Sequence, residues 1–397
     1  MPDPHAYRFD YESPVIVSGR GSTADLATEV AACDAERALV VTGRTVGSTD
    51  AVMDPVREGL GDRLAGVFAE TTPEKRLATA VEGLREMEAA GADALVAVGG
   101  GSSLDTAKAI ATLAATDDSP EEMAAEFESG GLLAVKGSPP PIVAVPTTLA
   151  GADLSMVAGV TATPENGFVS EETSGACYDR RLMPGAVVFD ADLFETTPDA
   201  VLAGSAMNGF DKGIETLYSR AATPVTDATA ARGIDRMREG LLAWAADEPD
   251  AMDTVLEGYV LVQYGISRPG ELTISLVHAF GHGLRHAFGM QQGTAHAVMA
   301  PHALEFLFEQ VDGRRDLLAD ALGVADADDP AAAVADAVAE VRDALDLPAR
   351  IRDVEGTDRE ALPEVARDVV ADSFMANAPA DFEPSAAEIE RVLDAAW

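Results

Sequence analysis

Five histidines gather in one stretch of the C-terminal half, SLVHAFGHGLRHAFGMQQGTAHAVMAPH: His278, His282, His286, His296 and His302. Histidine is the commonest metal ligand and the commonest general acid or base near neutral pH. The spacing of His278, His282 and His286 predicts a helix that carries all three rings along one face. The cluster predicts a reaction centre; its alternative is a row of half-buried, hydrogen-bonded rings.

The overall composition narrows the class of protein. The chain has 397 residues, 47% of them apolar, and 68 Asp and Glu against 28 Lys and Arg, which gives a formal net charge of −40. Repulsion of that size is screened at molar salt, where the Debye length is about 3 Å, so we expect a cytoplasmic protein from a cell with high internal salt. Such a surface repels nucleic acid and anionic membranes. No apolar run spans a bilayer, and the start MPDPHAYRFDYESP is too polar for a signal peptide.

Cysteine and lysine are both scarce. Cys33 and Cys177 fit no zinc spacing and are too few for a disulfide framework, so we expect ordinary buried thiols. The only lysines are Lys75, Lys108, Lys136 and Lys212. A chain that has replaced nearly all its lysines keeps the rest for a reason. Lys108 and Lys212 lie inside motifs, whereas Lys75 and Lys136 are expected at the surface.

The order of apolar runs predicts the fold. Short runs lie at 14–19, 37–43, 93–102, 141–148 and 185–190, with helical patterns such as 72–90 and 103–115 between them. This alternation is typical of βαβ units with a mostly parallel sheet. From Thr197, a candidate N-cap before Pro198, only helices are predicted, including an exposed one over 323–341. We therefore expect an α/β domain over 1–193 and an all-α domain over 194–397.

A glycine-rich turn follows one predicted strand, in VAVGGGSSLDTAKAIA. The strand runs into Gly99, Gly100 and Gly101, and then into a helix capped by Ser102 or Ser103. Glycines let the backbone approach a ligand closely, and free N–H groups at a helix start bind phosphate oxygens. The turn suits the pyrophosphate of a dinucleotide, although many such turns bind nothing.

Two further motifs carry polar side chains. Thr147 and Thr148 directly follow a strand, where open α/β sheets bind ligands, although they could equally cap the next segment. In AGSAMNGFDKGIETLYSR, Asn208 and Lys212 are four residues apart, as are Asp211 and Glu215. Each pair shares a helix face, and the alternative is two surface pairs.

Together these motifs resemble the iron-containing alcohol dehydrogenase superfamily, whose fold is shared with dehydroquinate synthase and glycerol dehydrogenase. The resemblance runs from FDYESPVIVSGRGS through GGGSSLDTAK, PTTLAGADLS and VVFDADL to HAFGH and APHALEF. The motifs look most like those of maleylacetate reductases, which carry PTTYAGSE and a GMNALAH-type helix. The resemblance implies an oxidoreductase with a Rossmann-like N-terminal domain, an all-α C-terminal domain, a nicotinamide cofactor in the cleft between them, and a homodimer.

The resemblance also implies a set of cofactor-binding residues: Gly43, Arg44, Gly99, Gly100, Gly101, Ser102, Asp105, Lys108, Thr147 and Thr148. Many NAD-preferring relatives carry an aspartate at the position of Gly43, where it bonds the ribose hydroxyls and repels a 2′-phosphate. Here that carboxylate is missing and Arg44 follows. We therefore expect NADP or NAD, with NADP at least tolerated.

Metal-dependent relatives hold a divalent cation with one aspartate and three histidines. On this sequence those positions are Asn208, Lys212, His278 and Gln292. Only one strong ligand remains, and an ammonium cannot bind a cation, so we expect no catalytic metal. A different set using His278, His282 or His286 is the alternative.

Without a metal, another positive charge must polarise the substrate oxygen. We expect the ammonium of Lys212 to stabilise the developing alkoxide, with Asn208 as a second donor. His282 would relay the proton while His278 orients the substrate.

Further substrate contacts are expected from Arg285, His286, Gln292 and His296. Arg285 and His286 stand where relatives have two glycines; they would recognise an oxyanion, or else form a surface-facing pair. The predicted function is hydride transfer between NAD(P) and a small alcohol, aldehyde, ketone or oxo-acid, with only a small molecule as partner. The alternatives are a metal-dependent enzyme with altered ligands, a catalytically silent nucleotide-binding homologue, and a non-redox lyase.

Overall fold

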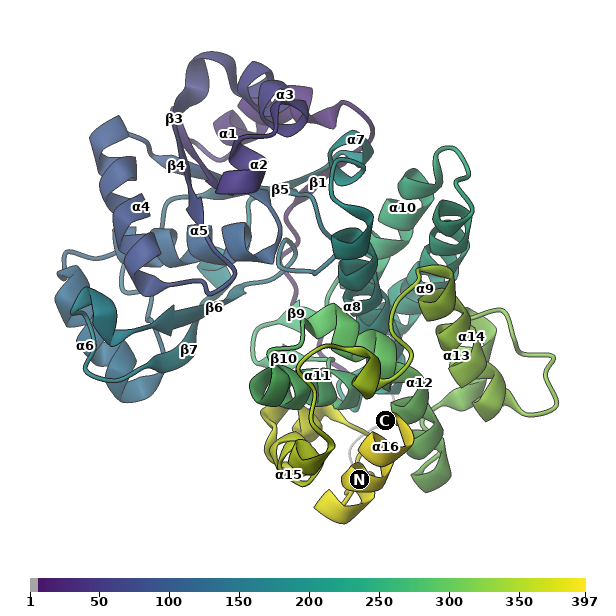
Figure 1. Ribbon diagram of the computed structural model, residues 1–397. Helices are drawn as coiled ribbons and strands as arrows, with labels where there is room; N and C mark the ends of the chain where they lie inside the picture. Colours follow the sequence, from purple (N-terminus) through teal and green to yellow (C-terminus); the bar gives the residue numbers. More distant parts are fainter. Residues whose placement is uncertain (1–5) are drawn as a thin grey trace. The chain divides into compact units, whose positions relative to one another are not determined.

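The computed structural model describes residues 6–397, which form two compact units (Figure 1). The α/β unit comprises Glu12–Thr197, and the helical unit comprises Pro198–Trp397 together with the residues before Glu12. The division at Thr197 lies four residues beyond the predicted one. The first five residues of the polar start lie outside the described part of the chain.

A six-stranded parallel sheet, in the order β1-β8-β5-β4-β2-β3, forms the centre of the α/β unit. Its strands are β1 (Val15–Ser18), β2 (Ala38–Gly43), β3 (Leu64–Thr71), β4 (Ala94–Gly99), β5 (Ile142–Pro146) and β8 (Ala186–Phe189). Every residue of β4, β5 and β8 is buried, as expected of parallel strands covered on both faces. The predicted βαβ pattern is confirmed. The sequence analysis missed β3, because this edge strand is only partly buried and shows no continuous apolar run.

Helices connect and cover these strands. They are α1 (Leu26–Ala32), α2 (Arg44–Gly47), α3 (Asp50–Leu60), α4 (Leu77–Ala90), α5 (Gly101–Ala114), α6 (Pro120–Gly130) and α7 (Ala191–Phe194), with an antiparallel hairpin of β6 (Val157–Ala162) and β7 (Thr173–Tyr178). Gly100 is the N-cap of α5, so the prediction that Ser102 or Ser103 caps it was wrong. Both serines lie in its first turn.

The helical unit contains the remaining elements. They are α8 (Asp199–Tyr218), α9 (Pro224–Ala245), α10 (Ala251–Gln263), β9 (Ser267–Arg268), β10 (Glu271–Leu272), α11 (Leu276–Phe288), α12 (Gln292–Gln310), α13 (Arg315–Ala321), α14 (Pro330–Ala344), α15 (Leu362–Ala371) and α16 (Ala386–Ala395). Pro198 is the N-cap of α8 rather than its first residue. The helix predicted over 323–341 begins only at Pro330. The hairpin β9–β10 corrects the expectation that strands stop at residue 193.

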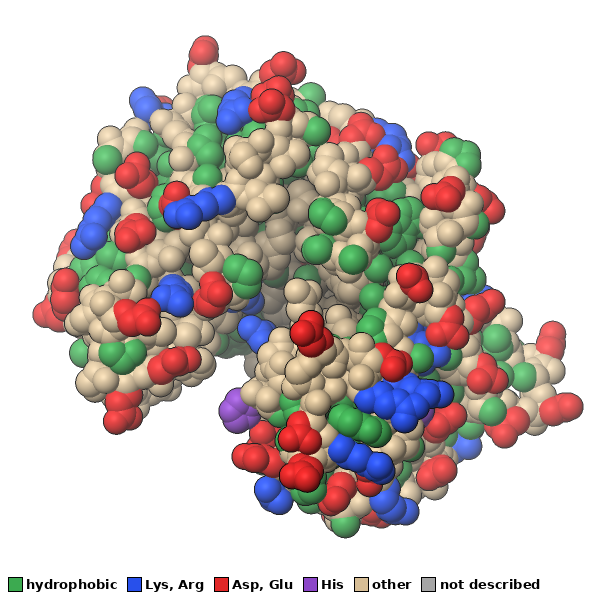
Figure 2. All heavy atoms as spheres, viewed as in Figure 1, with side chains coloured by type: hydrophobic (Ala, Val, Ile, Leu, Met, Phe, Trp, Pro, Cys, Tyr) green, Lys and Arg blue, Asp and Glu red, His purple; other side chains and the backbone are tan. Residues whose placement is uncertain are grey.

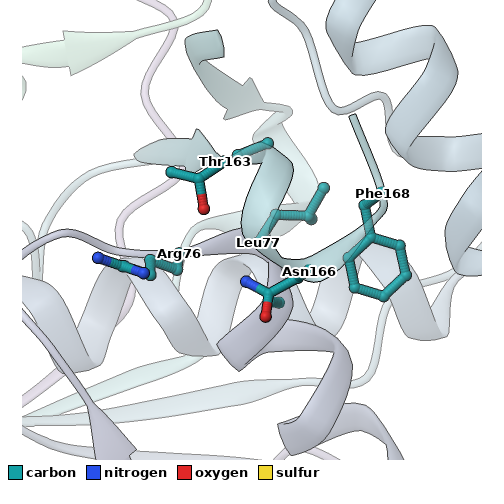
Figure 3. Close-up of a pocket in the computed structure, with 7 residues that line it drawn as sticks. Arg76, Leu77, Thr163, Asn166 and Phe168 are labelled. Carbon is teal, nitrogen blue, oxygen red and sulfur yellow. The ribbon is translucent and has the colours of Figure 1, made fainter. Parts of the chain in front are cut away.

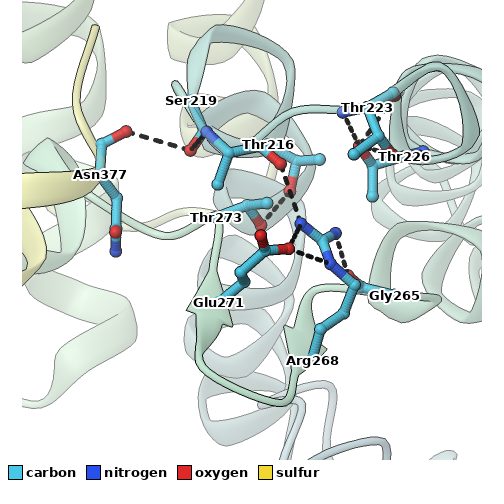
Figure 4. Close-up of polar contacts among 10 residues, drawn as sticks. Thr216, Ser219, Thr223, Thr226, Gly265, Arg268, Glu271, Thr273 and Asn377 are labelled. Atoms are coloured by element: carbon cyan, nitrogen blue, oxygen red, sulfur yellow. Dashed lines mark hydrogen bonds and ion pairs between the residues drawn. The ribbon is translucent and has the colours of Figure 1, made fainter. Parts of the chain in front are cut away.

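A buried guanidinium organises this hairpin. Arg268, only 1% exposed, donates to the backbone oxygens of Gly265 at 2.7 Å and Ala221 at 2.9 Å, and to the Glu271 carboxylate at 2.9 Å (Figure 4). The ring of Phe9 lies 5.3 Å from its Cζ atom. A buried charge is tolerated only when its donors are satisfied in this way. Phe9 thereby attaches the start of the described chain to the helical unit.

The surface is acidic, as the composition requires. Figure 2 shows Asp and Glu side chains spread over the visible face, with Lys and Arg interspersed. Within residues 6–397, no helix is long and apolar enough to cross a membrane. Both cysteines are free thiols; Cys177 is buried as expected, whereas Cys33 is partly exposed.

The Phe9 contact generates a stability prediction. We expect Gly265→Ala to lower the free energy of unfolding by about 2–4 kcal/mol. The cause is a backbone φ of +82° and a new methyl group that would lie 2.7 Å from Phe9 Cζ. The matched control is Gly270→Ala, where φ is +76° but no atom lies within 4 Å, and its cost should be about 1 kcal/mol. Urea unfolding at fixed salt measures both; equal losses would show that the Phe9 contact contributes nothing.

Candidate active site

A pocket of about 480 Å³ lies in the α/β unit, where β2, β3 and the glycine-rich turn end. Of the predicted cofactor residues, it is lined by Gly43, Arg44, Gly100 and Ser102. The hydroxyls of Thr71 and Ser103 lie 3.0 Å apart and join the end of β3 to the first turn of α5. The turn and the end of β2 thus share one pocket, as dinucleotide binding requires.

Two predicted cofactor residues have another role. Lys108 is completely buried, and its ammonium donates to the backbone oxygens of Ala152 at 2.6 Å and Val157 at 3.2 Å. Burial lowers the pKa of Lys108. Asp105 accepts a bond of 2.5 Å from Lys75, which is therefore not the plain surface residue we expected. Both side chains fasten β6 and its flanking loop to α5 instead of lining the pocket.

Thr147 and Thr148 support the turn. The Thr147 N–H donates to the Gly99 oxygen at 3.0 Å, and the Thr147 oxygen accepts from the Thr197 hydroxyl at 2.8 Å. Thr147 is buried, whereas Thr148 is partly exposed and lies against Gly100. Thr148 is therefore the threonine that remains a candidate for cofactor contact.

A second hollow in this unit has no place for a ligand. It lies at the start of α4 and is lined by residues that include Arg76, Leu77, Thr163, Asn166 and Phe168 (Figure 3). Its free volume is about 0 Å³, so it does not admit even a water molecule. The larger pocket is therefore the candidate of the two for nucleotide binding.

In the helical unit, α8, α11 and α12 bring together the positions that hold the metal in relatives. Asn208 and Lys212 lie one turn apart on α8, His278 is on α11, and Gln292 begins α12. Burial holds the pKa of His278 well below its ordinary value, and the charge of Lys212 lowers it further.

A buried carboxyl group orients His278. Glu215 Oε1 accepts from the backbone N–H of Val277 at 2.7 Å and of His278 at 3.2 Å, and Oε2 is bonded to His278 Nδ1. Burial raises the pKa of Glu215 to about 7. With Nδ1 donating to this carboxylate, Nε2 of His278 carries the lone pair and accepts a hydrogen bond from a substrate.

His296 is buried behind Gln292. Its Nε2 lies 2.9 Å from the Gln292 amide nitrogen, and its Nδ1 lies 3.2 Å from Asp211 Oδ2. Burial holds the pKa of His296 well below its ordinary value. Burial also raises the pKa of Asp211 well above its ordinary value. The expectation that His296 contacts substrate was wrong, because its ring is completely buried. It packs edge to face on His278, with the ring centroids 4.3 Å apart, and positions Gln292.

The sequence analysis missed the roles of Glu215 and Gly281. Asp211 and Glu215 are completely buried, so they are not surface pairs. A Cβ atom on Gly281 would lie 2.4 Å from the Gln292 amide nitrogen, so only glycine lets α12 place this amide against α11. The sequence signal for this close contact was Gly281, the first of the two glycines in HAFGHG.

The other two rings of α11 contact carboxylates at the C-terminal end of α15. His282 Nδ1 lies 2.8 Å from Asp372 Oδ2, and His286 Nδ1 lies 3.0 Å from Asp368 Oδ2, at the end of α15. His286 and Arg285 are exposed. The helix is confirmed, and its three histidines contact three different carboxylates. The predicted relay by His282 and oxyanion recognition by Arg285 and His286 stay predictions.

The side chains at the positions that the resemblance assigns to metal ligands do not fit a divalent cation. Lys212 offers an ammonium, and Gln292 turns its amide nitrogen, a donor, toward His296. Only His278 is a strong ligand there. Across residues 6–397, no group of three or more His, Cys, Asp or Glu side chains could hold a metal ion.

These two sites on this fold define an oxidoreductase, and the chain belongs to the iron-containing alcohol dehydrogenase family. The family description "Iron-containing alcohol dehydrogenase" matches residues 13–191, and "Fe-containing alcohol dehydrogenase family, C-terminal" matches residues 202–397.

Individual relatives agree with this assignment. Maleylacetate reductase of Burkholderia cepacia is 30% identical over 325 residues, which cover 81% of this chain and 82% of the relative. Lactaldehyde reductase of Escherichia coli K12 is 26% identical over 384 residues, 96% and 97% of the two chains. The crystal structure of sulfoacetaldehyde reductase from Bifidobacterium kashiwanohense in complex with NAD+ has the same fold, with a TM-score of 0.83, 20% identity and coverage of 98% and 99%.

The Glu215 contacts generate a kinetic prediction. Glu215→Gln should lower kcat by about 10–100-fold with little change in KM, because the new amide donates to His278 Nδ1 and imposes the other tautomer. Tyr218→Phe is the control: it removes only a hydroxyl that donates to Glu215 at 3.3 Å, and kcat should stay within about twofold. Steady-state rates, with folding checked by circular dichroism, decide; an unchanged kcat in Glu215→Gln contradicts this orienting role.

Proposed function

We propose that the protein interconverts a small alcohol and the corresponding aldehyde, ketone or oxo-acid by hydride transfer with NAD(H) or NADP(H), without a catalytic metal. The observation that supports the proposal is that Lys212 lies on α8 one turn after Asn208, and that α8 packs against α11 and α12, which carry His278 and Gln292. A cation would thus stand where the resemblance places a metal ligand in relatives. The α/β unit would bind the cofactor, and the helical unit would bind the substrate.

The proposed reaction has three steps: hydride transfer, stabilisation of the alkoxide, and its protonation. In the reducing direction, hydride passes from the dihydronicotinamide to the carbonyl carbon, and the carbonyl oxygen becomes an alkoxide. The Lys212 ammonium and the Asn208 amide stabilise that charge. His278 accepts a hydrogen bond at Nε2 from the hydroxyl of the alcohol. His282, 42% exposed and oriented by Asp372, delivers the proton from solvent.

The substrate class follows from size and charge. The relatives named above act on maleylacetate and lactaldehyde according to their names, which supports a small aldehyde or oxo-acid. Arg285 is an exposed cation one turn beyond His282 on α11, which supports a substrate that carries a carboxylate. We propose a cytoplasmic homodimer, as the family resemblance implies.

Lys212 is the decisive test of metal-free chemistry. Lys212→Met should lower kcat/KM by about 10²–10³-fold, the usual cost of losing one oxyanion donor. Lys136→Met is the control, because it removes a surface lysine that binds Asp118 at 2.5 Å. Dialysis against a chelator should leave the wild-type rate unchanged. The proposal fails if Lys212→Met retains its activity while His282→Ala abolishes it, or if chelation removes activity that a divalent metal restores.

The net charge of −40 supports activity in concentrated salt. Raising KCl from about 0.1 M to about 3 M should increase the thermal unfolding midpoint by on the order of 10 °C, because acidic side chains repel one another less. Sucrose at equal osmolality is the control, since it does not screen charge. A midpoint that is flat or falls with KCl contradicts the high-salt assignment.

A further inference from the structure

The end of β3 supplies an acidic residue that β2 lacks. Parallel pairing places Gly43 opposite Thr71 across the ladder. Glu70 therefore borders the same pocket as Gly43 and Arg44. Its side chain is 44% exposed, so a ligand can reach it. A carboxylate stands beside the end of β2 even though β2 itself carries none.

Arg44 holds this carboxylate in place. Arg44 Nε donates to Glu70 Oε2 at 2.8 Å, and Arg44 Nη2 donates to the same oxygen. Because both bonds go to Oε2, the other oxygen, Oε1, keeps its capacity to accept. Glu82 also lines the pocket and adds a second carboxylate. The Arg44 guanidinium is thus engaged by Glu70.

NAD(H) and NADP(H) would interact differently with the Glu70–Arg44 pair. The 2′-hydroxyl of NAD(H) is a neutral donor, and a carboxylate oxygen is its best acceptor. The 2′-phosphate of NADP(H) is an anion that would face Glu70 and would compete with it for Arg44. Like charges at this range repel strongly even where distant charges are screened.

We propose that Glu70 makes this enzyme select NAD(H) over NADP(H), with Arg44 as the positioning residue that orients the carboxylate. The inference rests on the proposed nicotinamide-dependent function and narrows it to one cofactor. It differs from the expectation from sequence that NADP(H) is at least tolerated.

Cofactor titrations test this selection directly. NADH and NADPH are titrated by fluorescence into the full-length protein, Glu70→Gln and Glu82→Gln at one fixed KCl concentration. The wild type should bind NADH at least about tenfold more tightly than NADPH. Glu70→Gln should reduce that ratio by about tenfold or more, chiefly because NADPH binds better once Arg44 is released. Glu82→Gln makes the same charge change in the same pocket and should shift the ratio by less than about threefold.

Several results of these titrations would contradict selection of NAD(H) by Glu70. The inference is overturned if the wild type prefers NADPH or binds both equally, if Glu70→Gln keeps the wild-type ratio, or if Glu82→Gln shifts it as much. Arg44→Gln is the second variant: it should weaken NADH binding and leave NADPH no weaker, whereas a selective loss of NADPH assigns Arg44 to the phosphate and overturns the proposal. Turnover is measured separately. NADH selection without hydride transfer contradicts the proposed function alone, and binding of neither cofactor contradicts both.

Discussion

The candidate active site depends on four ionisable side chains that are buried together in the helical unit. Asp211 and Glu215 on α8 meet His296 and His278 on α12 and α11. Burial raises the pKa values of the carboxyls and lowers those of the rings, so each group is driven toward its uncharged form. The Glu215–His278 bond joins α8 to α11, and Asp211 Oδ2 lies 3.2 Å from His296 Nδ1 between α8 and α12, so the three helices share one buried polar cluster. Lys212 follows Asp211 on α8.

This arrangement separates an outer layer of polar side chains from a buried supporting layer. Asn208, Lys212 and Gln292 are partly exposed, while His278, His296, Asp211 and Glu215 are buried. A substitution at the outer positions can therefore leave the supporting layer intact. In the proposed chemistry, the fixed cation of Lys212 stabilises the negative charge that a metal ion would otherwise stabilise as a Lewis acid.

Much of the fold was predictable, for definite physical reasons. Strands β2, β4, β5 and β8 are continuous apolar runs, and α11 shows helical spacing, so local sequence specifies them. Hairpin β9–β10 was missed because long-range contacts of Arg268 hold it. The site was predicted only in part. Sequence spacing placed Glu215 on a helix but could not say that this face is buried, and it counted His296 with the substrate residues for the same reason.

The edge position of β3 has a consequence for how this enzyme can change over generations. An edge strand has one neighbour in the sheet, and Glu70 projects from its partly exposed end rather than from the buried centre. Replacing Glu70 disturbs one surface ion pair and none of the apolar core formed by the inner strands. A single surface substitution at Glu70 could therefore change the preference between NAD(H) and NADP(H). Because the apolar core is untouched, the enzyme would stay folded while it adapts to the cofactor that its metabolism supplies.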